Sequence, residues 1–141
     1  EIITDIIFDG IEYKQSEIKS CLKCGLCAAS CPGGAIGDSG FERKMCLSEI
    51  TQKKGELDAE EKAMIARCGM VWGCDICQDV CPMNKEVNTT GIKEFIKGVR
   101  RRYTPGEDIK GRAYEWRGEK VIMRNAEIIA AYEIADNKTY K

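Results

Sequence analysis

The chain has 141 residues, with 22 Lys and Arg against 23 Asp and Glu, nine cysteines and no histidine. The lack of histidine excludes an imidazole base, a histidine-ligated haem and any histidine-containing zinc or Rieske site. No apolar run approaches the roughly 20 residues that cross a bilayer, and no signal peptide is recognisable. We therefore expect no membrane segment and a cytoplasmic, reducing setting. The length fits one ordinary domain, or a small domain with an appendage.

The first ten residues are rich in β-branched side chains. Ile2 to Phe8 predicts a strand that ends at the turn signal Asp9-Gly10. This apolar strand has no evident partner in the sequence that follows. We therefore interpret residues 1–10 as the remnant of a preceding domain in a longer protein.

Four cysteines then occur within eleven residues. The spacing is C-x2-C-x2-C-x3-C-P, formed by Cys21, Cys24, Cys27, Cys31 and Pro32. This is the ferredoxin-type signature of a 4Fe–4S cluster, in which the fourth cysteine binds a second cluster. Small residues between the ligands let backbone amides approach the inorganic sulfides, and such hydrogen bonds help to set the reduction potential.

Between residues 33 and 70 the sequence predicts a link and two helices. Glycines make residues 33–40 a flexible, turn-rich link. Residues 43–51 predict a short helix. Asp58–Glu61 has the pattern of a capping box, which begins a helix over residues 58–70 and turns residues 63–66 toward a core.

A second cysteine run, read C-x2-C-x3-C-P, is formed by Cys74, Cys77, Cys81 and Pro82. Two such runs predict two 4Fe–4S clusters. Disulfides are disfavoured because nine cysteines is an odd number and the chain shows no secretory signal. Zinc suits two C-x2-C pairs, yet four cysteines in eleven residues exceed what one tetrahedral zinc needs. Zinc remains the main alternative.

The crossed pattern of two-cluster ferredoxins divides the cysteines into two sets. The first set is Cys21, Cys24, Cys27 and Cys81, and the second contains Cys31, Cys74 and Cys77. The second set still lacks one ligand. From spacing alone, either Cys46, on the first predicted helix, or Cys68, on the second, supplies it.

After the second run the chain becomes helical and basic. We predict helices over residues 91–101, 107–116 and 119–135. The last is amphipathic, with apolar residues Val121, Ile122, Ala126, Ile128, Ile129 and Ala130. Residues 1–91 hold ten Lys and Arg against fifteen Asp and Glu, whereas residues 92–124 hold ten against five. This asymmetry suits an acidic electron-transfer domain joined to a basic surface that binds an anionic partner. Solvated helix faces give similar counts.

These elements predict an α-rich fold (α+β with few strands). The expected architecture is a two-cluster, bacterial-ferredoxin-like domain at residues 11–90, with a short, basic helical extension at residues 91–141. We expect the two cluster loops to be related by a pseudo-twofold axis. The clusters would replace part of the core that so small a domain otherwise needs.

Three segments resemble the C-terminal part of epoxyqueuosine reductases: Cys24–Cys27, Arg43–Thr51 and Gly73–Pro82. In that family the isolated cysteine of the middle segment completes the second cluster. The resemblance therefore implies that Cys46 is the eighth ligand. It also implies that Cys68 is a buried thiol that behaves as a small hydrophobe.

The likeness extends toward both ends of the chain. Gly111–Tyr114 and Arg124–Ala126 are similar to the start of the HEAT-like helical repeat that follows the clusters in those enzymes. Glu1–Asp5 resembles the last strand region of their preceding catalytic domain. The extension at residues 91–141 is thus expected to begin such a repeat.

The resemblance implies an electron-relay role. Epoxyqueuosine reductases use cobalamin, held in an N-terminal domain that this sequence does not contain, to remove the epoxide oxygen from a modified tRNA base. Their two 4Fe–4S clusters bring electrons to the cobalt. The chain alone is therefore not expected to turn over substrate. We expect a monomer that receives electrons from a ferredoxin, a flavodoxin or a similar donor.

The basic segment 97–124 is a candidate tRNA contact. Its positive residues are Lys97, Arg100, Arg101, Arg102, Lys110, Arg112, Arg117, Lys120 and Arg124. They suit phosphate binding, although a solvated surface gives the same pattern. Tyr103 and Trp116 suit base stacking or, more commonly, core packing, and Trp72 is expected to pack.

Two other functions fit the cysteine runs. The first is a stand-alone ferredoxin-like electron carrier, and the second is the cluster domain of a corrinoid reductive dehalogenase. Against the dehalogenase stand the Gly73–Pro82 segment, the 27 residues between Cys46 and Cys74, and the helix that contains Arg124-Asn125. A corrinoid-domain reading frame fused ahead of Glu1 would support the relay, and a start codon close to Glu1 would support the free carrier.

Overall fold

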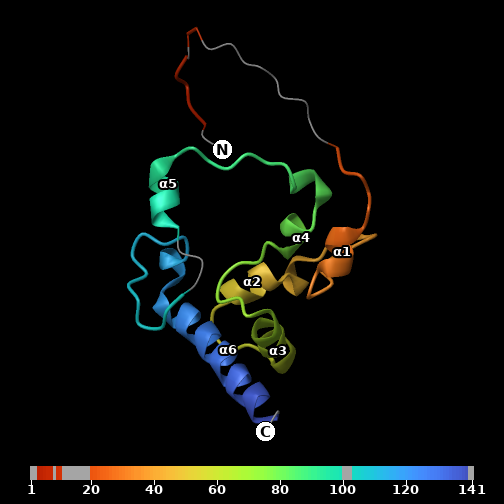
Figure 1. The fold of residues 1–141 in the computed structure, drawn as a ribbon, viewed down its shortest axis with the longest axis vertical. Coiled ribbons are helices and arrows are strands. Elements are labelled where there is room, and N and C mark those ends of the chain that lie inside the picture. Colours follow the sequence, from red (N-terminus) through yellow and green to blue (C-terminus); the bar gives the residue numbers. More distant parts are fainter. Residues whose placement is uncertain (1–2, 8, 11–19, 100–102, 140–141) are drawn as a thin grey trace.

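The computed structural model describes residues 3–7, 9–10, 20–99 and 103–139, the last six of these by their backbone alone. The described chain is mainly helical, which confirms the expected α-rich fold (Figure 1). Its α-helices are α1 (Leu26–Ser30), α2 (Leu47–Gln52), α3 (Ala59–Cys68), α4 (Ile76–Asp79), α5 (Lys93–Gly98) and α6 (Glu119–Thr139). Three short 3-10 helices are η1 (Arg43–Met45), η2 (Pro82–Asn84) and η3 (Glu115–Arg117).

Helix α3 begins and ends where its local sequence predicts. The Asp58 carboxylate accepts a hydrogen bond from the Glu61 amide at 2.9 Å, and the Glu61 carboxylate accepts one from the Asp58 amide at 3.1 Å. This reciprocal pair is the predicted capping box. Gly69 ends the helix with φ 63, a left-handed conformation that glycine adopts without strain. Of the four residues expected to face the core, Ile65 is fully buried, whereas Ala63 is exposed.

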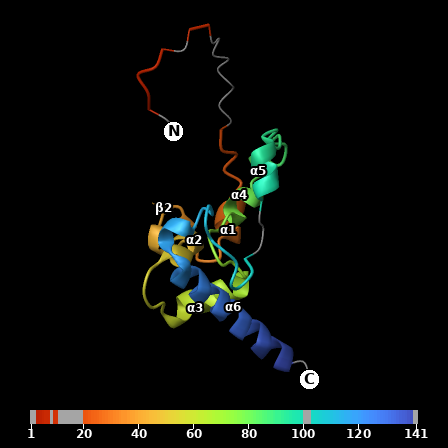
Figure 2. The same cartoon turned by 90° about the vertical axis from the view of Figure 1, so that its left-hand side faces the viewer.

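The core lies where α2, α3 and α6 meet. Leu47 and Ile50 of α2 pack with Leu57 and Ile65, and each of these side chains is buried. In both views α6 runs beside α2 and α3 (Figures 1 and 2). Burial of each Leu or Ile contributes about 1.5–3 kcal/mol, so this small cluster holds the three helices together.

Helix α6 confirms the predicted amphipathic helix at residues 119–135 and continues to Thr139. Val121, Ile122 and Asn125 are buried, and Glu127 on the other side is exposed. The apolar face of α6 packs against α3, so this part of the predicted extension lies directly on the core. The proposed boundary near residue 90 stays a prediction.

The predicted strand over residues 2–8 is wrong for residues 3–7, which form no regular secondary structure. They lie away from the helices in Figure 1, and Ile3, Ile6 and Ile7 are exposed. β-branched residues favour a strand only where a partner strand can accept their backbone hydrogen bonds. Residues 2 and 8 lie outside the described ranges.

The link at residues 33–40 contains part of a small hairpin that the sequence did not predict. Strand β1 (Ile36–Gly37) pairs antiparallel with β2 (Gly40–Phe41), and Ile36 lies opposite Phe41. The glycines that marked the segment as a link also permit the turn, since Gly40 has φ 114.

Two further helix predictions are corrected. The helix expected over residues 91–101 is limited to α5, and Arg100–Arg102 lie outside the described residues. The helix expected over 107–116 is a series of turns that ends in η3. Gly106 and Gly111 have φ values of 86 and 73, so the chain turns at the points where a helix would have to continue. In the part of the chain that is described, no helix has the length and apolarity to cross a membrane.

Candidate metal centre

The two cysteine runs fold alike. Cys27 lies in α1 and Cys77 in α4, and these short helices pack against each other (Figure 1). The cysteine that follows each helix has almost the same backbone: φ −69 and ψ 115 at Cys31, φ −71 and ψ 120 at Cys81. A following proline restricts both residues to this extended region. In each run the amide three residues further on donates to that cysteine's carbonyl oxygen, at 3.1 and 3.0 Å.

Four thiols from both runs line one cavity of about 250 Å³. They are Cys21, Cys24, Cys27 and Cys81, the four residues that the crossed pattern assigns to the first cluster. Leu22, Leu26, Pro82 and Met83 form much of its remaining wall. The structure thus brings Cys81 to the first run although 53 residues lie between it and Cys27 in the sequence. That all four bind one cluster stays a prediction.

The arrangement of these thiols around one cavity suits an iron–sulfur cluster. Among the described residues, no three His, Cys, Asp or Glu side chains lie close enough together to hold one metal ion. The four thiols instead stand around the walls of the cavity. An iron–sulfur cube binds one thiolate at each of four iron corners, so it needs ligands spread around a space of this kind.

Backbone amides point at two of the cysteine sulfurs. The Lys23 amide donates to Cys21 Sγ at 3.4 Å, and the Ala35 amide donates to Cys31 Sγ at 3.3 Å. Lys23 has φ 53 and is the one non-glycine residue with positive φ in the described ranges. Hydrogen bonds to ligand sulfur stabilise the thiolate and raise the potential of a bound cluster.

A second group of thiols gathers around Cys74. Burial raises the pKa of the Cys74 thiol, and a hydrogen bond from the Ile76 amide opposes this rise. Cys46, Cys77 and Cys68 lie near enough for their charges to raise the Cys74 pKa further. Cys46 and Cys77, which the second set groups with Cys74, therefore lie within electrostatic range of it, and their binding to one cluster with Cys31 stays a prediction. Cys68 lies within this range as well.

The two candidates for the eighth ligand, Cys46 and Cys68, differ in backbone conformation. The single helix predicted over residues 43–51 is broken at Cys46, which lies between η1 and α2 with φ −74 and ψ 124. These angles are close to those of Cys31 and Cys81. Cys68 is instead the last residue of α3, and burial raises the pKa of its thiol. Its assignment as a buried thiol stays a prediction, as does ligation by Cys46.

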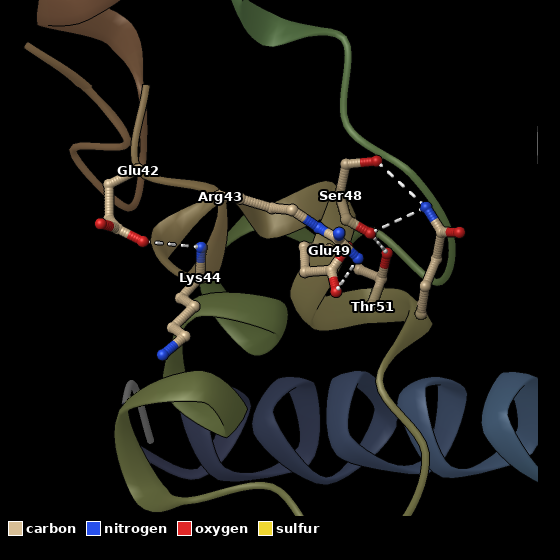
Figure 3. A network of polar contacts seen from close by, with 7 residues as sticks. Glu42, Arg43, Lys44, Ser48, Glu49 and Thr51 are labelled. Carbon is tan, nitrogen blue, oxygen red and sulfur yellow. Dashed lines mark hydrogen bonds and ion pairs between the residues drawn. The ribbon is translucent and has the colours of Figure 1, made fainter. Parts of the chain in front are cut away.

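An ion pair spans the helix break at Cys46. Arg43 donates to both carboxylate oxygens of Glu49, at 3.0 and 2.8 Å (Figure 3). These hydrogen bonds hold the pKa of Glu49 below its ordinary value. The Glu42 side chain accepts from the Lys44 amide at the start of η1. An exposed pair of this kind contributes little stability, but it connects the residues on either side of the cysteine.

The Cys31 turn packs tightly on the chain that leads into Cys46. A Cβ atom on Gly33 would lie 1.9 Å from the carbonyl oxygen of Met45, so only glycine fits there. A methyl group of Met64 lies 3.2 Å from the same position. Two predicted ligands of the second cluster, Cys31 and Cys46, are thereby held on neighbouring segments.

The aromatic residues near the second run pack together, as expected for Trp72. Its ring lies 5.9 Å from that of Tyr114 and 6.2 Å from that of Trp116, between ring centres. Tyr103 contacts Tyr114 edge-on at 6.5 Å. Trp116 is nevertheless 64% exposed, and the Arg117 guanidinium lies 4.3 Å from its ring centre. Trp116 therefore belongs to the edge of this aromatic group.

Comparison with known proteins agrees with this geometry. Residues 20–84 match the family model of the 4Fe–4S double cluster binding domain. Residues 20–84 are therefore similar to a 4Fe–4S double cluster binding domain. The match begins one residue before Cys21 and ends after Pro82, so it encloses all nine cysteines.

The proteins that this chain resembles include reductases. The chain is 34% identical to an epoxyqueuosine reductase from Listeria monocytogenes, over 93% of the chain and 37% of that protein. It is also 34% identical to an uncharacterized protein from Geobacillus stearothermophilus, over 94% of the chain and 65% of that protein. The structure resembles epoxyqueuosine reductase from Streptococcus thermophilus, with a TM-score of 0.62 and 30% identity over 86% of the chain and 35% of that structure. The chain thus spans about a third of the length of the reductases that it matches.

Proposed function

We propose that this chain is the electron-relay part of an oxidoreductase of the epoxyqueuosine reductase type. The observation that carries the proposal is the cavity lined by Cys21, Cys24, Cys27 and Cys81. Thiols from two distant runs meet there in the crossed arrangement of a two-cluster protein. The similarity to named epoxyqueuosine reductases over nearly the whole chain supports the choice of enzyme.

In this proposal the nine cysteines have defined roles. Cys21, Cys24, Cys27 and Cys81 hold the first cluster, and Cys31, Cys46, Cys74 and Cys77 hold the second. When bound, the clusters supply one-electron transfer. Cys68 stays a thiol at the edge of the core. Because each run gives its last cysteine to the other cluster, packing of α1 on α4 fixes both sites at once.

Backbone amides and apolar side chains of the chain influence the reduction potentials of the two clusters. Amides of Lys23 and Ala35 donate to ligand sulfurs and favour the thiolate form. Leu22, Leu26 and Met83 exclude part of the water from the first cavity. A lower local dielectric and amide donors act on the reduction potential in opposite directions, and their balance sets its value.

The wider role follows from the family resemblance. We propose that the complete protein holds cobalamin in a further domain, that the clusters supply its electrons, and that the substrate is a tRNA. A ferredoxin, a flavodoxin or a similar protein would be the donor, and the setting would be cytoplasmic. The same proposal makes the protein a monomer.

A tRNA contact through the basic segment 97–124 is part of this proposal. Arg117 stacks on Trp116 at the surface and Lys97 lies on the exposed α5, so both suit phosphate binding. Arg124 suits it less, because its guanidinium donates to the carbonyl oxygens of Lys53 and Gly55. Phosphate binding predicts a steep loss of affinity as salt rises from 50 to about 200 mM, and a flat salt response would exclude this contact.

Redox titration tests the relay. The anaerobically reconstituted chain should take up one electron per cluster, hence two per chain, and show the electron paramagnetic resonance of reduced 4Fe–4S clusters. A chain that accepts no electrons, or that binds zinc in place of iron, would refute the proposal. The genomic sequence ahead of Glu1 then separates the relay from a free carrier, since only the relay requires a fused corrinoid domain.

A further inference from the structure

A buried polar network joins helix α6 to the segments that carry two predicted ligands of the second cluster. Its centre is Asn125, which is fully buried. The Asn125 side-chain amide donates to the carbonyl oxygens of Thr51 at 2.7 Å and Val71 at 2.9 Å. Its oxygen accepts two hydrogen bonds from Arg124, at 3.1 and 2.8 Å. This amide therefore makes all four hydrogen bonds that its chemistry allows.

Arg124 extends the network to the end of α2. One of its terminal nitrogens donates to the carbonyl oxygens of Lys53 at 2.8 Å and Gly55 at 2.7 Å. These acceptors lie 71 and 69 residues away in the sequence. Burial lowers the pKa of Arg124, and the charges of Glu56 and Glu61 oppose that shift. Carbonyl groups of the segment that follows α2 thus accept hydrogen bonds from α6.

Thr51 continues the network toward Cys74. Its side chain is fully buried, and the hydroxyl donates to the Ser48 carbonyl oxygen at 3.0 Å (Figure 3). The same hydroxyl accepts a hydrogen bond from the Gly73 amide at 3.0 Å. Gly73 directly precedes Cys74, and it has φ 71. A side chain of α2 therefore holds the backbone at the entry to the second cysteine run.

Together these contacts fix two chain segments relative to each other. The first is α2, which begins directly after Cys46, and the second is Val71–Gly73, which leads into Cys74. The apolar core beneath them holds α2 and α3 together but is not directional. Hydrogen bonds centred on a buried, fully paired amide, in contrast, are directional and favour one arrangement.

We propose that Thr51, Arg124 and Asn125 are positioning residues for the second cluster, which they serve by setting the separation of Cys46 and Cys74. The inference rests on the proposed function through the assignment of these two cysteines to one cluster. It makes α6 part of the machinery of the second site. None of the described residues that line the first cavity takes part in this network, so the first cluster serves as an internal reference.

Paired substitutions at Thr51 test this role in the reconstituted chain. Thr51→Val keeps the shape of the side chain but removes both hydroxyl hydrogen bonds, whereas Thr51→Ser keeps them. We expect Thr51→Val to shift the midpoint potential and resonance spectrum of one cluster and to release its iron to a chelator about 10-fold faster. Thr51→Ser should keep the potential, the spectrum and the rate of iron release of the wild type. The affected cluster is identified as the one missing from the Cys74→Ser variant.

Arg124→Lys gives a second probe that leaves the buried Thr51 in place. It keeps the positive charge but cannot reproduce the four hydrogen bonds of the guanidinium, so we expect the same cluster to change. Glu127→Gln, on the exposed side of α6, is the matched control and should alter neither cluster. Equal effects on both clusters, or a fall in thermal stability with both spectra unchanged, would show that the network is only structural. Failure of the wild-type chain to bind two clusters would instead refute the proposed function.

Discussion

The close approach of Gly33 to Met45 leads to a quantitative prediction. Alanine at position 33 would place its Cβ 1.9 Å from the Met45 carbonyl oxygen, whereas real contacts of this kind are not shorter than about 3.0 Å. The two backbone segments must therefore separate by roughly an ångström or more. Gly33 does not have a positive φ, so the alanine itself is not strained, and the clash alone decides the result.

The expected loss of stability is about 2–3 kcal/mol, the upper part of the range for overpacking, because a backbone carbonyl cannot rotate away as a side chain can. For a chain of this size the melting temperature should fall by on the order of 10 °C. Cys46 follows Met45, so the displaced segment carries a predicted ligand with it. We therefore also expect Gly33→Ala to retain only the first cluster after gel filtration.

Gly37→Ala is the matched control for this prediction. It lies in the same link, has no atom within 4 Å of its Cβ position and has no positive φ. Replacing such a glycine stabilises a protein by about 0.4–1 kcal/mol through the unfolded chain. Anaerobic thermal unfolding and iron content, measured on both variants, provide the comparison. If Gly33→Ala melts and binds iron as Gly37→Ala does, the packing of the Cys31 turn on the Cys46 segment is refuted.

Four other substitutions give three separate tests. Cys46→Ser should lose one cluster and Cys68→Ser should lose none; full iron retention in the Cys46 variant would reverse the assignment of the eighth ligand. Asp58→Ala removes the acceptor of the capping box and should lower the free energy of unfolding by about 1 kcal/mol, with unchanged spectra of both clusters. Ile65→Ala opens a cavity at the centre of the core and should lower the free energy of unfolding by about 2–5 kcal/mol. A loss smaller than that of Asp58→Ala would contradict the position of Ile65 in the core.

The features that the sequence predicted correctly have local or periodic signals. The capping box at Asp58 needs only four consecutive residues, and α6 repeats its apolar residues at helical spacing. The cysteine runs are recognised because a cluster requires fixed spacing between its ligands. The meeting of Cys81 with Cys21 followed from that chemistry alone, and no propensity could have predicted it.

The features that the sequence did not predict depend on contacts between distant segments. Residues 43–51 have the composition of a helix, but the structure breaks that helix at Cys46, a predicted ligand. Arg124 looked like a candidate phosphate contact, yet its partners include main-chain carbonyl groups about 70 residues away. Nothing in the sequence near Asn125 indicates that its amide would be buried against Thr51. A buried polar network leaves no periodic signal.

The count of iron and sulfide in the anaerobically reconstituted chain tests the central claim most directly. Two interlocked 4Fe–4S clusters require eight iron and eight sulfide per chain, and Cys81→Ser should reduce both by about half. A colourless chain, a chain that holds zinc, or one that keeps all its iron when Cys81 is replaced would contradict the account.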